Sequence, residues 1–170
     1  MKHERKRTRL IDYDYSSPHY YFVTICTKNK KNLFGDVINS KVVLNKNGIV
    51  VKELWLRIVE HFTNVELDEY ILMPNHFHGI IIIYDKVGLR SPQTEIKTKN
   101  FSLSQIIAYF KYQTTKRINL IEGVEGRVIW QRSFYDRIIR NEKELEKIRH
   151  YIHYNAIKWD EDKGDGNLEI

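Results

Sequence analysis

The order of strand and helix patterns along the chain is the feature that most narrows the folds it can adopt. Alternating or β-branched stretches predict strands, and apolar residues at helical spacing predict helices. The strands are expected over 20–27, 65–73, 76–84 and 127–133, and the helices over 48–62, 102–118 and 141–159. Short antiparallel pairs joined by two crossover helices are typical of the split βαβ plan. We therefore expect an α+β, ferredoxin-like βαββαβ antiparallel sheet. Strand 76–84 would lie centrally beside strand 20–27, the two crossover helices would cover one face, and the last helix would cover the other.

Local signals mark the ends of these elements. Polar residues that cap helices precede each helical pattern: Asn47 before Gly48, Ser102 with Gln105, and Asn141 with Glu144. Pro74 and Asn75 are turn residues between two strand patterns, and a small hairpin is expected around 37–44.

The length of 170 residues fits one domain with a sizeable core. We expect a single domain over 1–160, which includes a basic irregular arm over 1–18 and a mobile loop over 85–101. An acidic, flexible tail would follow over 161–170. No apolar run reaches the length of a membrane span, and the one cysteine, Cys26, cannot form an internal disulfide. These features predict a cytoplasmic protein with no membrane partner.

The net charge of +6 and the pI of about 9.3 favour a polyanionic partner such as nucleic acid. The candidate DNA-binding residues form a basic head and a second cluster in the middle of the chain: Arg5, Lys6, Arg7, Arg9, Lys111, Lys116 and Arg117. Each of these side chains could equally be part of an ordinary solvated surface, so charge alone does not decide the partner.

Two histidines two residues apart lie at the start of the predicted central strand. Because strand side chains alternate in direction, His76 and His78 would project from the same face, and Phe77 would point into the core. Two imidazoles on one rigid strand can bind a divalent ion with one or two further donors. The pair lies on the sheet face that the crossover helices leave free, which favours a metal site over two half-exposed histidines.

Tyr151 and Asn155 are four residues apart on the last predicted helix and therefore share one of its faces. If this helix covers the free sheet face, Asn155 could supply a third metal ligand, and Tyr151 would lie one turn away. A phenol needs a nearby cation or base to act as a nucleophile at neutral pH. Tyr135 and Tyr154 remain alternative nucleophiles.

The ordered set of motifs resembles a known family of enzymes. Residues 74–79, Pro-Asn-His-Phe-His-Gly, followed late in the chain by Tyr151 and Asn155, resemble the single-tyrosine HUH transposases. In that family two histidines flank a hydrophobic residue. More narrowly, the chain resembles the REP-associated tyrosine transposases from about residue 13 to residue 159. The supporting stretches are 13–15 (YDY), 21–24 (YFVT), 130–132 (WQR) and 149–152 (RHYI).

This resemblance implies metal-dependent nicking and strand transfer of single-stranded DNA through a 5′-phosphotyrosine intermediate. It makes Tyr151 the nucleophile and His76, His78 and Asn155 the metal ligands. Mg²⁺ or Mn²⁺ is the implied ion, and a DNA hairpin of repetitive-element type is the implied partner. The relatives often have proline after the asparagine, where this chain has Ala156. REP-associated relatives are expected to be monomeric, so we expect a monomer rather than a dimer.

Two other functions are compatible with the sequence. The chain could be a non-catalytic nucleic-acid-binding module, or a hydrolytic metal-dependent nuclease in which water attacks the DNA. The complete set of histidines, tyrosine and asparagine argues against the binding module, since a decayed site would have lost at least one member. A covalent protein–DNA adduct separates the transferase from both alternatives.

Overall fold

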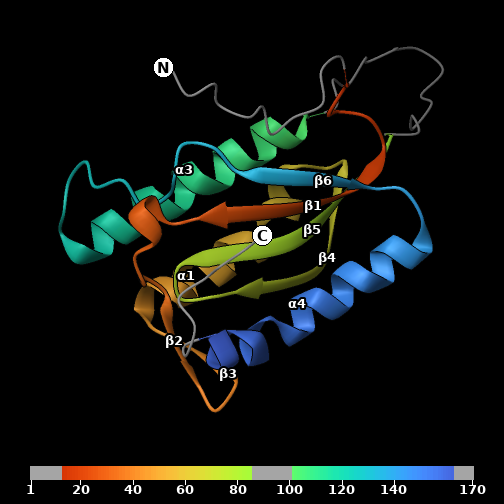
Figure 1. The fold of residues 1–170 in the computed structure, drawn as a ribbon. Helices are drawn as coiled ribbons and strands as arrows, with labels where there is room; N and C mark the ends of the chain where they lie inside the picture. The colour runs from red at the N-terminus through yellow and green to blue at the C-terminus, as the bar shows by residue number, and fades with distance from the viewer. Residues whose placement is uncertain (1–12, 86–100, 163–170) are drawn as a thin grey trace, which may run out of the picture.

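A computed structural model describes residues 13–85 and 101–162 of the chain (Figure 1). Its elements in chain order are β1 (His19–Cys26), the short 3-10 helix η1 (Lys28–Lys30), β2 (Gly35–Ile38), β3 (Lys41–Leu44), α1 (Lys46–Leu56), α2 (Ile58–His61), β4 (Val65–Leu72), β5 (His76–Ile83), α3 (Leu103–Glu122), β6 (Tyr135–Ile139) and α4 (Glu142–Asp162).

Four of these strands form one antiparallel sheet in the order β4-β5-β1-β6. Strands β5 and β1 are the central pair, and their register places His76 opposite Cys26 and His78 opposite Thr24. This strand order is that of the βαββαβ ferredoxin-like plan. The predicted fold class and the central position of the histidine-bearing strand are therefore confirmed.

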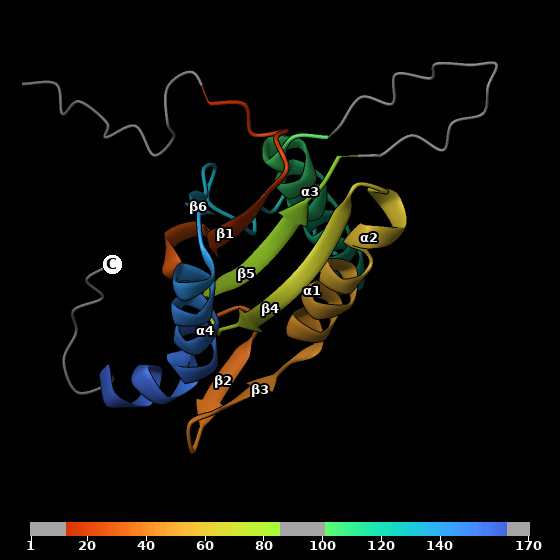
Figure 2. The ribbon, with the colours of Figure 1, turned by 90° about the vertical axis from the view of Figure 1, so that its right-hand side faces the viewer.

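The main core lies between the sheet and helices α1 and α3, which cover the same face (Figure 2). The strands contribute every second residue to it, among them Val23 of β1 and Phe77 of β5. Trp55 of α1 packs between Phe77 and Phe110 of α3, with ring centroids 4.4 and 5.3 Å away. The stripe predicted for the second helix, including Phe110, is buried here.

The absence of a side chain at Gly79 leaves the space in which Trp55 packs against β5. A Cβ atom on Gly79 would lie 2.7 Å from Cζ2 of Trp55 and 2.7 Å from Cε1 of Phe77. Any side chain at this position would therefore push on the aromatic centre of the core, directly behind the strand that carries the two histidines.

Helix α4 covers the opposite face of the sheet (Figure 2). Its buried residues Leu145, Ile148 and Ile152 pack against Ile80 of β5 and Ile139 of β6 in a smaller core of their own. This confirms the prediction that the last helix covers the face left free by the crossover helices.

The β2–β3 hairpin supports the C-terminal part of α4, and it lies where the sequence predicts a hairpin. Val37 and Ala156 are buried together with Met73. The backbone N–H of Ser40 at the hairpin turn donates to a carboxylate oxygen of Asp160, 2.5 Å away. The hairpin thus holds the part of α4 that follows Asn155.

The first helix begins earlier and ends sooner than the pattern predicts. Asn45, not Asn47, is its N-cap, because the Asn45 side chain accepts a hydrogen bond from Gly48 N at 3.0 Å. Asn47 lies inside α1 and donates to Glu122 of α3 instead. The helix breaks at Arg57, so the predicted single helix over 48–62 is a longer and a shorter helix.

The strand predicted over 127–133 is wrong, because the fourth strand of the sheet is β6, over 135–139. Trp130 makes only an isolated bridge with Thr27. Its indole N–H donates to the Thr114 hydroxyl at 2.8 Å, so Trp130 is buried with Ile129 from a loop segment, 127–133, whose other residues are partly or fully exposed. The last helix also extends past the predicted end at residue 159, to Asp162.

Several predicted segments lie wholly or mostly outside the described residues: most of the arm over 1–18, the loop over 85–101 apart from its two end residues, and most of the tail over 161–170. Among the described helices, none combines the length and the apolar character needed to cross a membrane.

Candidate active site

Strand β5 places His76 and His78 side by side on the sheet face that α4 covers. Ile80 is the next residue on this face and packs against α4, whereas Phe77 enters the main core. The two imidazole centroids are 4.6 Å apart, and the residues are 8% and 4% exposed. The structure thus brings the two predicted metal ligands together in an enclosed position.

Helix α4 places the other two predicted site residues over these histidines. The Tyr151 hydroxyl lies 3.3 Å from Nε2 of His78. The Asn155 side chain hydrogen bonds with both His76 and Tyr151. Asn155 is buried, whereas Tyr151 is 40% exposed, so the nucleophile candidate can be reached from solvent and the ligand candidate is enclosed.

Burial decides the charge of these groups. Loss of solvent lowers the pKa of His76 to about 4, against a smaller opposing effect of the hydrogen bond with Asn155. Burial, and then the charge of His76, hold the pKa of His78 well below its usual value. Both imidazoles are therefore neutral at pH 7, the form that ligates metals. Burial also raises the pKa of Tyr151, so its hydroxyl is a neutral phenol in the metal-free protein.

The donor set fits a divalent cation. His76, His78 and Asn155 offer two neutral nitrogens and one amide oxygen on neighbouring side chains, and this mixture suits Mn²⁺ and is compatible with Mg²⁺. Within residues 13–85 and 101–162, no three His, Cys, Asp or Glu side chains gather as a metal site. The fit therefore depends on the amide of Asn155 as the third protein donor.

Two polar neighbours of the histidines were not identified as functional from the sequence. The Thr24 hydroxyl lies 2.8 Å from Nδ1 of His78, and Oδ1 of Asn75 lies 2.7 Å from Nδ1 of His76. Thr24 comes from the neighbouring strand, 54 residues away in sequence, so only the strand register reveals its contact. Asn75 was interpreted only as a turn residue.

Aromatic side chains enclose the rest of the site. Phe22 of β1 stacks on His78 at 5.4 Å and meets the Tyr151 ring edge to face at 6.0 Å. Trp159 of α4 packs beside His76, with centroids 5.7 Å apart. Cys26 is buried opposite His76 in the sheet. These side chains limit the access of water to the histidines.

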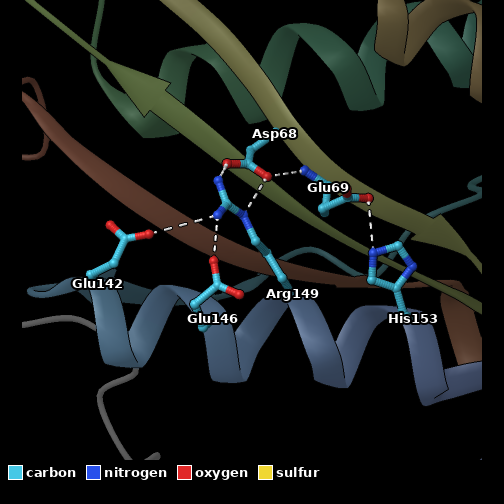
Figure 3. A network of polar contacts seen from close by, with 6 residues as sticks. All are labelled: Asp68, Glu69, Glu142, Glu146, Arg149 and His153. Carbon is cyan, nitrogen blue, oxygen red and sulfur yellow. Dashed lines mark hydrogen bonds and ion pairs between the residues drawn. The ribbon is translucent and has the colours of Figure 1, made fainter.

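A polar network fastens α4 to strand β4 next to the site (Figure 3). Arg149 donates to both carboxylate oxygens of Asp68, at 3.1 and 2.6 Å, and it also pairs with Glu146 on its own helix. One turn further along, His153 lies 3.5 Å from Glu69.

An irregularity in β4 presents these carboxylates. The register of β4 against β5 shifts between Leu67 and Tyr70, so Asp68 and Glu69 lie in a β-bulge. Bulges redirect side chains and occur often beside active sites. Here the bulge brings Asp68 within reach of Arg149, two residues before Tyr151.

Among the described contacts, neither alternative tyrosine meets His76 or His78. Tyr135 is opposite Thr24 at the β6 edge of the sheet and is half exposed. Tyr154 is exposed on α4, where its ring packs against His150. Tyr151 is the tyrosine whose hydroxyl contacts a site histidine.

The basic residues singled out in the described middle of the chain lie away from this site. Lys111, Lys116 and Arg117 lie on α3, across the sheet from α4. The Lys111 ammonium group donates to the carbonyl groups of Gln131 and Arg132, which holds the loop before β6. The three arginines and one lysine predicted in the basic head, Arg5, Lys6, Arg7 and Arg9, lie outside the described residues.

Other lysines flank Tyr151, and the sequence interpretation missed them. Lys147 and Lys158 precede and follow Tyr151 by four and seven residues on α4, so they lie on nearly the same line of the helix. Both are exposed. A helical projection of α4 would have placed them beside the tyrosine.

Comparison with known proteins gives a family. The profile of the family described as "Transposase IS200 like" matches residues 15–155. A Haemophilus influenzae protein of unassigned function is 39% identical over 169 residues, covering 95% of this chain and 93% of that protein. A second protein of that organism, named "Putative REP-associated tyrosine transposase", is 24% identical over 154 residues, covering 85% and 74%.

A solved structure has the same fold. It is described as a REP-associated tyrosine transposase bound to a REP hairpin, and it superposes with a TM-score of 0.60 at 17% identity. The alignment covers 89% of this chain and 72% of that one. The matched span of 15–155 includes both histidines, Tyr151 and Asn155.

Proposed function

Because this chain belongs to the family of IS200-like transposases, we propose that it nicks and rejoins single-stranded DNA through a covalent bond to Tyr151. The observation that carries the proposal is the position of the Tyr151 hydroxyl, 3.3 Å from the enclosed His78 and hydrogen bonded to Asn155. A partly exposed phenol beside a set of metal donors is the arrangement that a metal-assisted tyrosine nucleophile requires.

The residues of the site have separate roles in the proposed reaction. His76, His78 and Asn155 would hold a divalent cation, Mg²⁺ or Mn²⁺, which when bound polarises the scissile phosphate and favours the phenolate form of tyrosine. Tyr151 attacks phosphorus and forms the phosphotyrosine bond to the 5′ side of the break. The bond from phosphorus to the 3′ oxygen breaks, the phenolic proton passes to solvent, and the departing oxygen takes up a proton as a 3′-hydroxyl.

Rejoining is the reverse of this step. The phosphotyrosine bond conserves the energy of the broken phosphodiester, so a 3′-hydroxyl can attack it without an external energy source. Asn155 remains hydrogen bonded near the Tyr151 oxygen and can orient it in both directions. We propose a DNA hairpin of repetitive-element type as the substrate, in line with the REP hairpin bound by the protein of similar fold.

The test is incubation with 5′- and 3′-labelled hairpin DNA and Mn²⁺, read on a denaturing gel. Wild-type protein should form a slowly migrating covalent species with the label 3′ of the break, and Tyr151→Phe should not. Tyr154→Phe is the matched control, since it removes a hydroxyl three residues away from a more exposed ring.

Three results would count against the proposal. Cleavage without an adduct would favour a hydrolytic nuclease, and an adduct that persists in Tyr151→Phe would move the nucleophile to another tyrosine. Binding to hairpins without either product, over a broad set of hairpins, would favour a non-catalytic binding module.

A further inference from the structure

Each histidine of the site has its Nδ1 atom paired with a neighbouring side chain. Nδ1 of His76 lies 2.7 Å from Oδ1 of Asn75, and both residues are buried. A neutral imidazole carries its single proton on one of its two nitrogens, and an amide oxygen can only accept a hydrogen bond. The proton of neutral His76 must therefore be on Nδ1, which leaves the lone pair on Nε2.

The orientation of the Asn75 amide is fixed independently of the histidine. Its Nδ2 group donates to the backbone carbonyl of Lys30 at 3.2 Å. A flipped amide would place its oxygen against that carbonyl oxygen and its NH₂ group against the ring nitrogen. The Lys30 carbonyl thus determines that the amide oxygen, and not the nitrogen, faces His76.

The turn that presents the Lys30 carbonyl has an uncommon backbone. Asn29 and Lys30 both have positive φ angles, 59° and 50°, in the left-handed region that non-glycine residues rarely adopt. The N–H and the hydroxyl of Thr27 donate to the backbone carbonyl of Asn75, at 2.9 and 3.0 Å. The backbone carbonyl and the side-chain amide of Asn75 are thereby both hydrogen bonded to the segment that follows β1.

His78 has a hydroxyl partner at each ring nitrogen. The Thr24 hydroxyl lies 2.8 Å from Nδ1, and the Tyr151 hydroxyl lies 3.3 Å from Nε2. Because a hydroxyl can donate or accept a hydrogen bond, these contacts are compatible with a proton on Nδ1 and a lone pair on Nε2. Nε2 is the nitrogen on the side of Tyr151.

We propose that Asn75 is a positioning residue of this site, which fixes His76 as the Nδ1–H tautomer so that Nε2 can bind the divalent cation. Thr24 has the corresponding role for His78. Metal-binding histidines commonly donate their other N–H to such a partner, which orients the ring. The inference about the ion rests on the proposed function, whereas the tautomer is a property of the metal-free protein.

The tautomer can be measured directly. Long-range ¹H–¹⁵N correlation spectra of metal-free protein labelled with ¹⁵N-histidine distinguish Nδ1–H from Nε2–H imidazoles. The signals of His76 and His78 are assigned from His76→Gln and His78→Gln. Both rings should be Nδ1–H, and an Nε2–H tautomer of His76 in the wild type would overturn the proposal.

Two substitutions of Asn75 distinguish the role of its hydrogen bond with His76 from the role of its hydrogen bond with Lys30. Asn75→Ala loses both, whereas Asn75→Asp keeps an acceptor for His76 but cannot donate to the Lys30 carbonyl. Mn²⁺ affinity, measured by titration calorimetry without DNA, should fall roughly 10- to 100-fold in Asn75→Ala and stay near the wild-type value in Asn75→Asp.

An equal loss of affinity in Asn75→Asp and Asn75→Ala would show that Asn75 only holds the turn at Lys30, and would contradict the proposal. Asn32→Ala, an exposed asparagine in the same segment, is the control that should bind Mn²⁺ as the wild type does. Normal Mn²⁺ binding without any DNA adduct would count against the proposed function and leave this inference standing.

Discussion

Tyr151 combines two properties that seldom occur in one side chain. It is exposed enough to meet DNA, yet its hydroxyl reaches an enclosed pair of imidazoles. Burial raises its pKa, so the phenol is a weak nucleophile until a cation lies close to it. If Tyr151 is the nucleophile, as proposed, the metal-free site would keep it inactive, and its activity should depend on the ion.

Gly79 should be intolerant of even one additional carbon. Gly79→Ala would place a methyl group 2.7 Å from Trp55 and Phe77, and overpacking of this kind costs about 1–3 kcal/mol. Urea denaturation should show a corresponding drop in the free energy of unfolding. An unchanged midpoint would mean that Trp55 moves aside at no cost, and that this glycine is not needed for the packing behind the histidines.

Helix α4 carries both Tyr151 and Asn155, so its attachment to the sheet sets the geometry of the site. Apolar residues hold its buried face, and the Arg149–Asp68 pair adds a directional contact at the β4 bulge. The carboxylate is 12% exposed and the guanidinium 32%. A contact of two hydrogen bonds with this degree of burial contributes more to the free energy of unfolding than an exposed ion pair would.

Removing the Asp68 charge should loosen this attachment. Asp68→Asn should lower the free energy of unfolding at pH 7 by about 1 kcal/mol, discounted for the partial exposure of Arg149. Glu146→Gln, which removes the more exposed partner of the same arginine, should have a much smaller effect. Equal effects of the two substitutions in urea denaturation would contradict this role of Asp68.

The same pair predicts a pH dependence. The hydrogen bonds from Arg149 lower the pKa of Asp68 below its usual value. A depressed folded-state pKa gives stability that is present above the unfolded-state pKa of about 3.9 and lost as pH falls through the folded-state pKa. The stability difference between wild type and Asp68→Asn should thus be full at pH 7 and shrink below about pH 4. A difference that persists unchanged at lower pH would show that charge is not its source.

The elements that the sequence predicted well are those with strong local patterns. The capping box of Ser102 and Gln105 and the buried stripe of α4 are as expected. The pattern predicts Asn47 as the cap of α1, but Asn45 is the same residue type two positions earlier, and in the structure its side chain accepts the hydrogen bond from Gly48 N. The local pattern around Trp130 predicts a strand, because an apolar residue buried in a loop has the same local pattern as a strand residue.

The site could be predicted only in part, because some of its contacts join residues that are far apart in sequence. The alternation at His76 and His78 and the helical spacing of Tyr151 and Asn155 are local, and the resemblance to a family joins them. The contact of Thr24 with His78 depends on the register of two strands far apart in sequence, which no local pattern contains.

The charged side chains of the described residues around Tyr151 suggest where DNA would lie under the proposed function. Lys147 and Lys158 lie beside Tyr151 along α4, whereas the flank of α4 that faces β4 carries the acidic network of Figure 3. The α3 residues predicted from sequence lie across the sheet from the nucleophile. A strand attacked by Tyr151 should therefore contact the lysines of α4.

Salt dependence of DNA binding can test this path. Lys147→Ala and Lys158→Ala should each weaken binding of single-stranded DNA and reduce the slope of log K against log salt by about 0.7. Lys52→Ala on α1 is the control, and Lys116→Ala tests the α3 surface. DNA binding is measured by fluorescence anisotropy with the metal chelated, and each lysine variant also carries Tyr151→Phe. Under these conditions binding is measured without cleavage. A change in Lys116→Ala without one in the α4 variants would place the DNA on the other face.

The most direct test of the central claim is to locate the covalent bond in the protein. After reaction with hairpin DNA and nuclease digestion, trypsin should release residues 150–158, HYIHYNAIK, with a nucleotide attached. Fragment-ion mass spectrometry should place the nucleotide on Tyr151. A nucleotide on Tyr154 of this peptide, or on Tyr135 in residues 133–137, would contradict the proposed site.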